Sequence, residues 1–191
     1  MHTFLGLKKT TAALLIALSA CPWASADDVT HPVLRDKLLQ MKALDQAPRM
    51  AGKTSLETAD SDAANRAELK AIIKEFGWPT LPMVGSSASQ GAWLIVQHAD
   101  DEPLWQADVL ETLEHLSRQQ LVPPEQVAYL YDRLHRPQRF GTQGACVAKL
   151  RWQPREIEWP ESVDQRRKAA NLDPLETYVE FASKVLCARF E

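Results

Sequence analysis

The sequence predicts a mostly α-helical protein, in which an antiparallel array of helices carries one small β-hairpin near residues 145–159. Three observations lead to this prediction. Apolar residues recur at three- and four-residue spacing along most of the chain, whereas apolar and polar residues alternate with a period of two at residues 146–152. Prolines and glycines also leave only short loops between the central helical segments, and helices joined by short loops are antiparallel neighbours.

The first 26 residues have the order of a secretory signal. Two lysines precede an apolar run at residues 11–20, which is too short to span a bilayer. Residues 24–26 (Ala-Ser-Ala) form a small-x-small cleavage site, whereas residues 18–21 (Leu-Ser-Ala-Cys) fit a lipobox in which Cys21 would carry a lipid anchor. We therefore expect a signal peptide at 1–26 and a single α-helical domain at 27–191, periplasmic or secreted from a bacterium, with a lipoprotein as the alternative.

Composition and charge exclude several classes of protein. With 45% apolar and 25% charged residues, the chain is neither disordered nor collagen-like. Residues 1–26 hold two of the 22 basic residues and no acidic one, so 20 basic and 25 acidic residues remain, a net charge of −5. This balance argues against nucleic-acid binding. No second apolar run of about 18 residues follows, so no transmembrane segment is expected in the mature chain.

The apolar stripes place the helices in order. They predict helices over residues 32–48, up to Gly77, 86–98, 104–120 and 124–136, with residues 50–62 as a connection or a loose helix start. Two prolines within four residues predict an irregular, stiff loop at residues 78–85. Ser86 and Ser87 are expected to cap the helix that follows this loop.

The last quarter of the chain predicts the hairpin and two further helices. Residues 146–152 read as one strand, residues 153–155 as its turn, and a second short strand would hold Ile157 and Trp159, so that Trp152 or Trp159 packs onto the helices. A short helix is expected from residue 160 to 170. The last helix is expected to start at Asp173, as its cap, and to continue through residue 186.

Two cysteines remain after the signal segment. Cys146 and Cys187 form an even pair, which in an oxidising compartment predicts a disulfide, with two buried thiols as the alternative.

Strong chemical motifs are missing from the sequence. It has no HExxH, Walker loop, GxGxxG, GxSxG or CxxC pattern, and the four histidines after residue 26 are scattered at positions 31, 98, 115 and 135. We therefore expect no metal site and no cofactor.

The chain nevertheless contains several short blocks, namely Trp78-Pro79-Thr80, Val84-Gly85, Gln97-His98-Ala99-Asp100, Asp132-Arg133, Gly141-Thr142-Gln143 and Arg166-Arg167. Together they resemble an uncharacterised family of secreted and cytosolic bacterial proteins. The resemblance covers about Phe76 to Tyr178, and Phe140 and Asn171 depart from it where tyrosine and glycine are common. It implies positions for a site but no activity.

These blocks contain the candidate site residues. His98 ends an apolar helix and Asp132 lies on a later one, so the two could meet if the helices are antiparallel neighbours, with His98 as a general base oriented by Asp132. The candidates for ligand binding are Arg133, Thr142, Gln143 and Arg167. Each has a structural alternative: a buried histidine bonded to a carbonyl, an Asp132–Arg133 ion pair that ties the loop to the helices, and a turn at residues 141–143.

The sequence thus supports three hypotheses on function. The first is an exported cell-envelope protein that binds a small-molecule or envelope-protein ligand through a His, Asp, Arg and Gln site. The second is a hydrolase-like enzyme with His98 as general base and Asp132 behind it. The third is a periplasmic inhibitor or immunity protein, which fits the acidic balance and the size of the chain.

Overall fold

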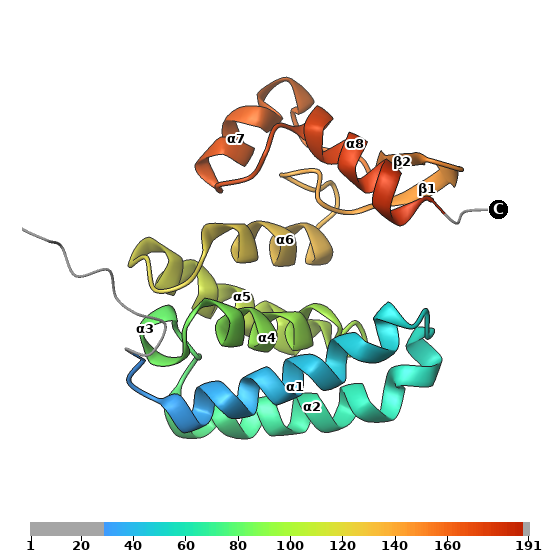
Figure 1. Cartoon of the computed structure of the whole chain (residues 1–191). Helices are drawn as coiled ribbons and strands as arrows, with labels where there is room; N and C mark the ends of the chain where they lie inside the picture. Colours follow the sequence, from blue (N-terminus) through green and yellow to red (C-terminus); the bar gives the residue numbers. More distant parts are fainter. Residues whose placement is uncertain (1–28, 189–191) are drawn as a thin grey trace, which may run out of the picture.

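The structure is a computed structural model that describes residues 29–188 of the chain. The predicted signal peptide and Cys21 lie outside these residues. The mostly α-helical fold with one small antiparallel hairpin is confirmed (Figure 1). Its elements are α1 (Pro32–Met50), α2 (Ser55–Phe76), α3 (Leu81–Val84), α4 (Ser86–Gln97), α5 (Pro103–Arg118), α6 (Pro124–Leu134), β1 (Gly144–Ala148), β2 (Arg151–Pro154), the 3-10 turn η1 (Pro160–Ser162), α7 (Val163–Ala169) and α8 (Leu175–Leu186).

Helices α1 to α6 share one apolar core. In Figure 1, α1 and α2 run side by side along the bottom, α4 and α5 lie above them, and α6 separates this part from the hairpin, α7 and α8. Leu38, Leu69, Ile95, Leu113 and Leu130 are buried in this core. Within the described part of the chain, no helix is both long and apolar enough to cross a membrane.

The contact between α1 and α4 is unusually close, and it sets the geometry of the site. A Cβ atom added at Gly91 would lie 2.9 Å from Lys42 Cβ and 3.0 Å from the Leu38 carbonyl oxygen. Asp45 follows Leu38 by seven residues and His98 follows Gly91 by seven, which is about two helical turns, and Asp45 and His98 are in contact. The glycine therefore lets two helices approach closely enough to pair a carboxylate with an imidazole.

The structure decides between the two alternatives for residues 50–62 and corrects two further local predictions, the irregular loop and the serine cap. The second helix begins at Ser55, where Thr54 and Glu57 form a capping box, so most of residues 50–62 are helical. The expected irregular loop contains α3, because Pro82 lies in the first turn, where proline needs no amide donor. Helix α4 starts after Gly85, and no serine side chain caps it.

The last helix also starts differently from the prediction. Its N-cap is Pro174 rather than Asp173, and Asp164 of α7 accepts a hydrogen bond from the Leu175 amide at 2.7 Å. The carboxylate of Asp164, 11 residues earlier, thus accepts the hydrogen bond at this helix start, where Asp173 was expected to be the cap.

The hairpin turns earlier than predicted. Strand β1 pairs antiparallel with β2, and the turn falls at residues 149–150, with Leu150 at a φ of 56°. The alternation of apolar and polar residues continues through this turn, and the turn contains neither glycine nor asparagine. The sequence pattern therefore gave no sign of a turn at this position. Ile157 instead forms an isolated bridge with Gln138.

A second, smaller core lies between the hairpin and α8. Trp152 packs edge-on to Tyr178 at 5.4 Å, next to Ala182, whereas Trp159 is exposed. Cys146 and Cys187 form a disulfide, with a Cα–Cα distance of 5.5 Å. The bond ties the end of α8 to β1.

Candidate functional site

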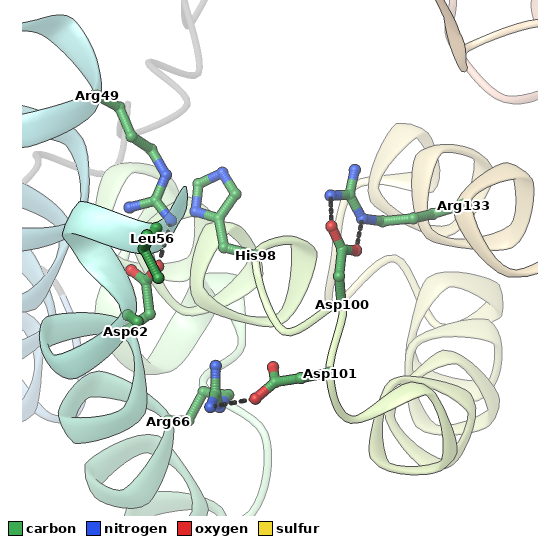
Figure 2. A pocket seen from close by; sticks show the side chains of 9 residues that line it. Arg49, Leu56, Asp62, Arg66, His98, Asp100, Asp101 and Arg133 are labelled. Carbon is green, nitrogen blue, oxygen red and sulfur yellow. Dashed lines mark hydrogen bonds and ion pairs between the residues drawn. The ribbon is translucent and has the colours of Figure 1, made fainter. Parts of the chain in front are cut away.

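A polar hollow of about 420 Å³ opens beside the C-terminal end of α4 (Figure 2). Four parts of the chain surround it: α1, α2, the turn between α4 and α5, and α6. Most of its lining residues are charged. They are Arg49, Leu56, Ala59, Asp62, Arg66, His98, Asp100, Asp101 and Arg133.

His98 is held by a buried carboxylate. Its Nδ1 lies 2.8 Å from Asp45 Oδ1, and Asp45 is only 1% exposed. Figure 2 shows the imidazole ring standing between Arg49 on one side and Asp100 on the other. The expected contact between His98 and Asp132 is wrong, because α1 supplies the partner through its close approach to α4.

Several groups stabilise the charge on Asp45. Burial would raise the pKa of this carboxyl, but the hydrogen bond and charge of His98 outweigh it, helped by the Gln46 amide and by Arg49. The net result is a pKa below the ordinary value for aspartate. Asp45 is therefore an ionised anchor that orients His98.

Arg49 joins this anchor to the wall of the hollow. Its Nη1 donates to the Asp45 carbonyl oxygen at 2.7 Å, and its Nη2 donates to Asp62 Oδ2 at 2.8 Å. Thr58 Oγ1 donates to the same Asp62 oxygen at 2.8 Å. The inner wall is thus a connected polar network from α1 and α2.

Two adjacent aspartates form the opposite rim. Asp100 binds Arg133 through both carboxylate oxygens, each at 2.7 Å from a guanidinium nitrogen. Asp101 Oδ2 accepts from Arg66 Nη2 at 2.8 Å. Ion pairs therefore connect the turn between α4 and α5 to α6 on one side and to α2 on the other (Figure 2).

Asp132 lies outside the hollow and organises a loop. Its Oδ1 accepts the amides of Arg139 at 2.7 Å and Phe140 at 3.0 Å. Its Oδ2 accepts the Thr142 amide and the Thr142 hydroxyl, both at 2.9 Å. A buried carboxylate with four such donors is a fixed acceptor for the backbone of residues 139–142.

The Gly-Thr-Gln block is a braced loop that reaches the rim. The side-chain amide of Gln138 holds the backbone of Gln143 through two hydrogen bonds. Its Oε1 accepts from the Gln143 backbone N–H at 2.9 Å, and its Nε2 donates to the Gln143 carbonyl oxygen at 2.9 Å. The Gln143 side chain lies 3.5 Å from Arg133 Nη1. Gln143 therefore adjoins Arg133, whereas Thr142 contacts Asp132, and neither residue lines the hollow.

Arg167 also lies away from the hollow. It is buried, and its Nη1 donates to the Phe140 carbonyl oxygen at 2.5 Å and its Nε to the Asp173 carbonyl oxygen at 2.6 Å. Its guanidinium carbon lies 5.0 Å from the centre of the Tyr178 ring. These contacts tie α7 to α8 and to the loop.

Of the predicted site residues, the structure brings His98 and Arg133 into the hollow and Thr142 and Gln143 into the loop beside it. Asp132 lies on α6 and anchors this loop, and Arg167 lies away from the hollow. The sequence reasoning missed Asp45, Arg49, Asp62 and Arg66. A signal for Asp45 was present, because it continues the apolar stripe of Leu34, Leu38 and Met41 with a carboxylate.

Among residues 29–188, no group of three or more His, Cys, Asp or Glu side chains could hold a metal ion.

Comparisons with known proteins give a family but no activity. No curated protein and no solved structure matches the chain. A match to a family of unknown function covers residues 32–188, which includes the hollow, the braced loop and the disulfide. The chain therefore belongs to the family of unknown function DUF6624.

Proposed function

We propose that the mature chain is an exported cell-envelope protein that binds a small polar molecule in the His98 hollow. The pairing of His98 with Asp45 is the observation that carries this proposal. Because Asp45 holds Nδ1, Nε2 is the ring nitrogen that can meet a ligand. A buried carboxylate is costly unless it is paired, and here it fixes one histidine in one orientation at the edge of a hollow.

The lining favours a polar ligand over an apolar one. A volume of about 420 Å³ lies in the range of small-molecule sites. Arg49, Arg66 and Arg133 offer fixed donors, while Asp62, Asp100 and Asp101 offer acceptors. A ligand with several hydrogen-bonding groups can use both kinds.

Export rests on separate support. The basic, apolar and small-residue order of residues 1–26 is typical of secretory signals, and disulfides such as Cys146–Cys187 persist in oxidising compartments. Cell fractionation and the mass of the mature N-terminus test this part. A soluble protein starting at Asp27 or a lipidated Cys21 would support export, whereas an intact cytoplasmic chain would contradict it.

The binding proposal can be tested by NMR. Protein labelled with ¹⁵N in its histidines is screened against a library of small polar molecules while the imidazole resonances are observed. A ligand of the hollow shifts the His98 signals and leaves those of His115, an exposed histidine of α5, unchanged. If hits move both histidines alike or neither one, the hollow is not a ligand site.

The same pairing favours one alternative, a hydrolase-like enzyme. An imidazole oriented by a carboxylate is a general base, and Asp45 rather than Asp132 would stand behind it. The described lining contains no Ser, Thr or Cys, so His98 would activate a water molecule.

This alternative is tested with chromogenic esters and phosphodiesters. Turnover that falls at least about 100-fold in both Asp45→Asn and His98→Gln, but not in His115→Gln, would support it. Turnover that survives His98→Gln would exclude His98 as the base.

A further inference from the structure

The turn between α4 and α5 places two consecutive carboxylates on arginines of two different helices. Asp100 occupies the guanidinium fork of Arg133 on α6, and Asp101 bonds Arg66 on α2 (Figure 2). Both arginines and both aspartates line the hollow that contains His98.

The two partners in each ion pair differ in exposure. The side chains of Asp100 and Asp101 are 67% and 64% exposed, whereas those of Arg133 and Arg66 are 26% and 11% exposed. Exposed ion pairs contribute little to stability, because water and salt compete for both charges. The aspartates therefore face solvent and can turn outward, while the arginines belong to the wall.

The Arg133 contact has the geometry of anion recognition. Two guanidinium nitrogens meet two carboxylate oxygens at equal distances of 2.7 Å, which is the bidentate arrangement in which arginine binds carboxylates and phosphates. Any oxyanion group of similar width can take the same place.

We propose that the ligand of the hollow carries an oxyanion group, a carboxylate or a phosphate-like group, which displaces Asp100 from the Arg133 fork. This inference rests on the proposed binding function of the hollow. Asp100 is a built-in occupant of the site, and the rest of the ligand extends toward His98. Arg66 differs from Arg133, because it meets Asp101 through a single contact and also pairs with Glu102.

The charge balance accommodates such a ligand. The charges of the inner wall are paired with one another, because Arg49 contacts both Asp62 and Asp45, and His98 contacts Asp45. When Asp100 turns outward into solvent, the incoming anion takes its place as the negative partner of Arg133.

The test uses sulfate and succinate as probes of the two oxyanion types. Each is titrated into the protein at constant ionic strength, made up with chloride, while the Arg133 Nε–H and His98 ring resonances are followed by NMR. Asp100→Asn removes the internal competitor and should tighten binding by about threefold to fivefold. Asp108→Asn removes an equal charge from the exposed face of α5 and should change the affinity by less than about twofold.

Arg133 supplies the decisive variants. In the Asp100→Asn background, Arg133→Gln should abolish the response of the His98 ring resonances, and Arg133→Lys, which keeps the charge without the fork, should weaken that response. Arg151→Gln, an exposed arginine of β2, is the matched control and should leave binding unchanged. A preference for sulfate or for succinate identifies the group as phosphate-like or carboxylate.

Two results would overturn the inference. The first is equal tightening by Asp100→Asn and Asp108→Asn, which would show a general charge effect. The second is no response to either probe in the Asp100→Asn protein. If neutral molecules still shift His98 in that case, the hollow binds ligands without an oxyanion and only this inference fails. If nothing shifts His98, the proposed binding function fails as well.

Discussion

Asp132→Asn should destabilise the protein strongly, because the substitution replaces one acceptor oxygen by a donor in a buried cluster of donors. Oδ1 can keep the Arg139 and Phe140 amides. The new NH₂ group faces the Thr142 amide, which loses its acceptor, while the Thr142 hydroxyl can rotate and accept instead. One charge-assisted hydrogen bond contributes about 1.5 to 3 kcal/mol, and a buried unsatisfied donor costs about 1 to 3 kcal/mol.

The expected loss is therefore about 3 to 5 kcal/mol, or about 10 °C in Tm for a chain of this size. Urea denaturation followed by circular dichroism measures it. Asp164→Asn is the control, since that exposed carboxylate accepts the single Leu175 amide and should cost about 1 kcal/mol. An Asp132→Asn loss no larger than that of Asp164→Asn would refute the assignment of Asp132 as the anchor of residues 139–142.

Three further predictions follow from particular contacts. Reduction of Cys146–Cys187, which closes a separation of 41 residues, should lower the free energy of unfolding by about 4 kcal/mol, measured by denaturation with and without reductant; an unchanged midpoint would contradict it. The pKa of Asp45 is lowered in the folded state, so the ionised carboxylate stabilises the fold above the ordinary pKa of 3.8, and this stabilisation is lost as the pH falls through the folded-state pKa. The free energy of unfolding should therefore fall less in acid for Asp45→Asn than for the natural chain, measured by denaturation at several pH values. Equal acid sensitivity of the two proteins would contradict this. Gly144→Ala should cost about 1 to 3 kcal/mol, because a Cβ there would collide with the Trp152 ring and the Gln153 carbonyl oxygen; a thermal scan that shows no loss would exclude the collision.

The sequence predicted the elements better than their ends. Apolar stripes located the helices, because a helix with one buried face needs apolar residues every three or four positions, and this spacing is visible in the local sequence. Helix α8 begins where Asp164 meets Leu175, and the hairpin turns at Leu150 without a glycine. Both depend on contacts or backbone conformations that local residue preferences do not encode.

The site was predicted in part for the same reason. His98 and Arg133 stood out as polar residues in recognisable blocks, and both line the hollow. The partner of His98 could not be found from spacing, because Asp45 lies 53 positions earlier and meets it only through the approach of α1 to α4 at Gly91. Asp132 was assigned to the wrong partner, since its donors are backbone amides and the sequence does not show where these point.

Two consecutive residues of α6 have different partners: Asp132 holds the loop and Arg133 lines the hollow. Successive side chains on a helix point about 100° apart, so Asp132 faces the backbone of residues 139–142 while Arg133 faces Asp100. Gln143, at the end of the braced loop, lies beside Arg133 and so connects the loop held by Asp132 to the arginine of the hollow. The loop therefore limits where the Arg133 fork can point. For this reason Asp132→Asn, although distant from His98, should also weaken anion binding at Arg133, and an affinity for sulfate that is unchanged in the folded variant would show that the fork is positioned by α6 alone.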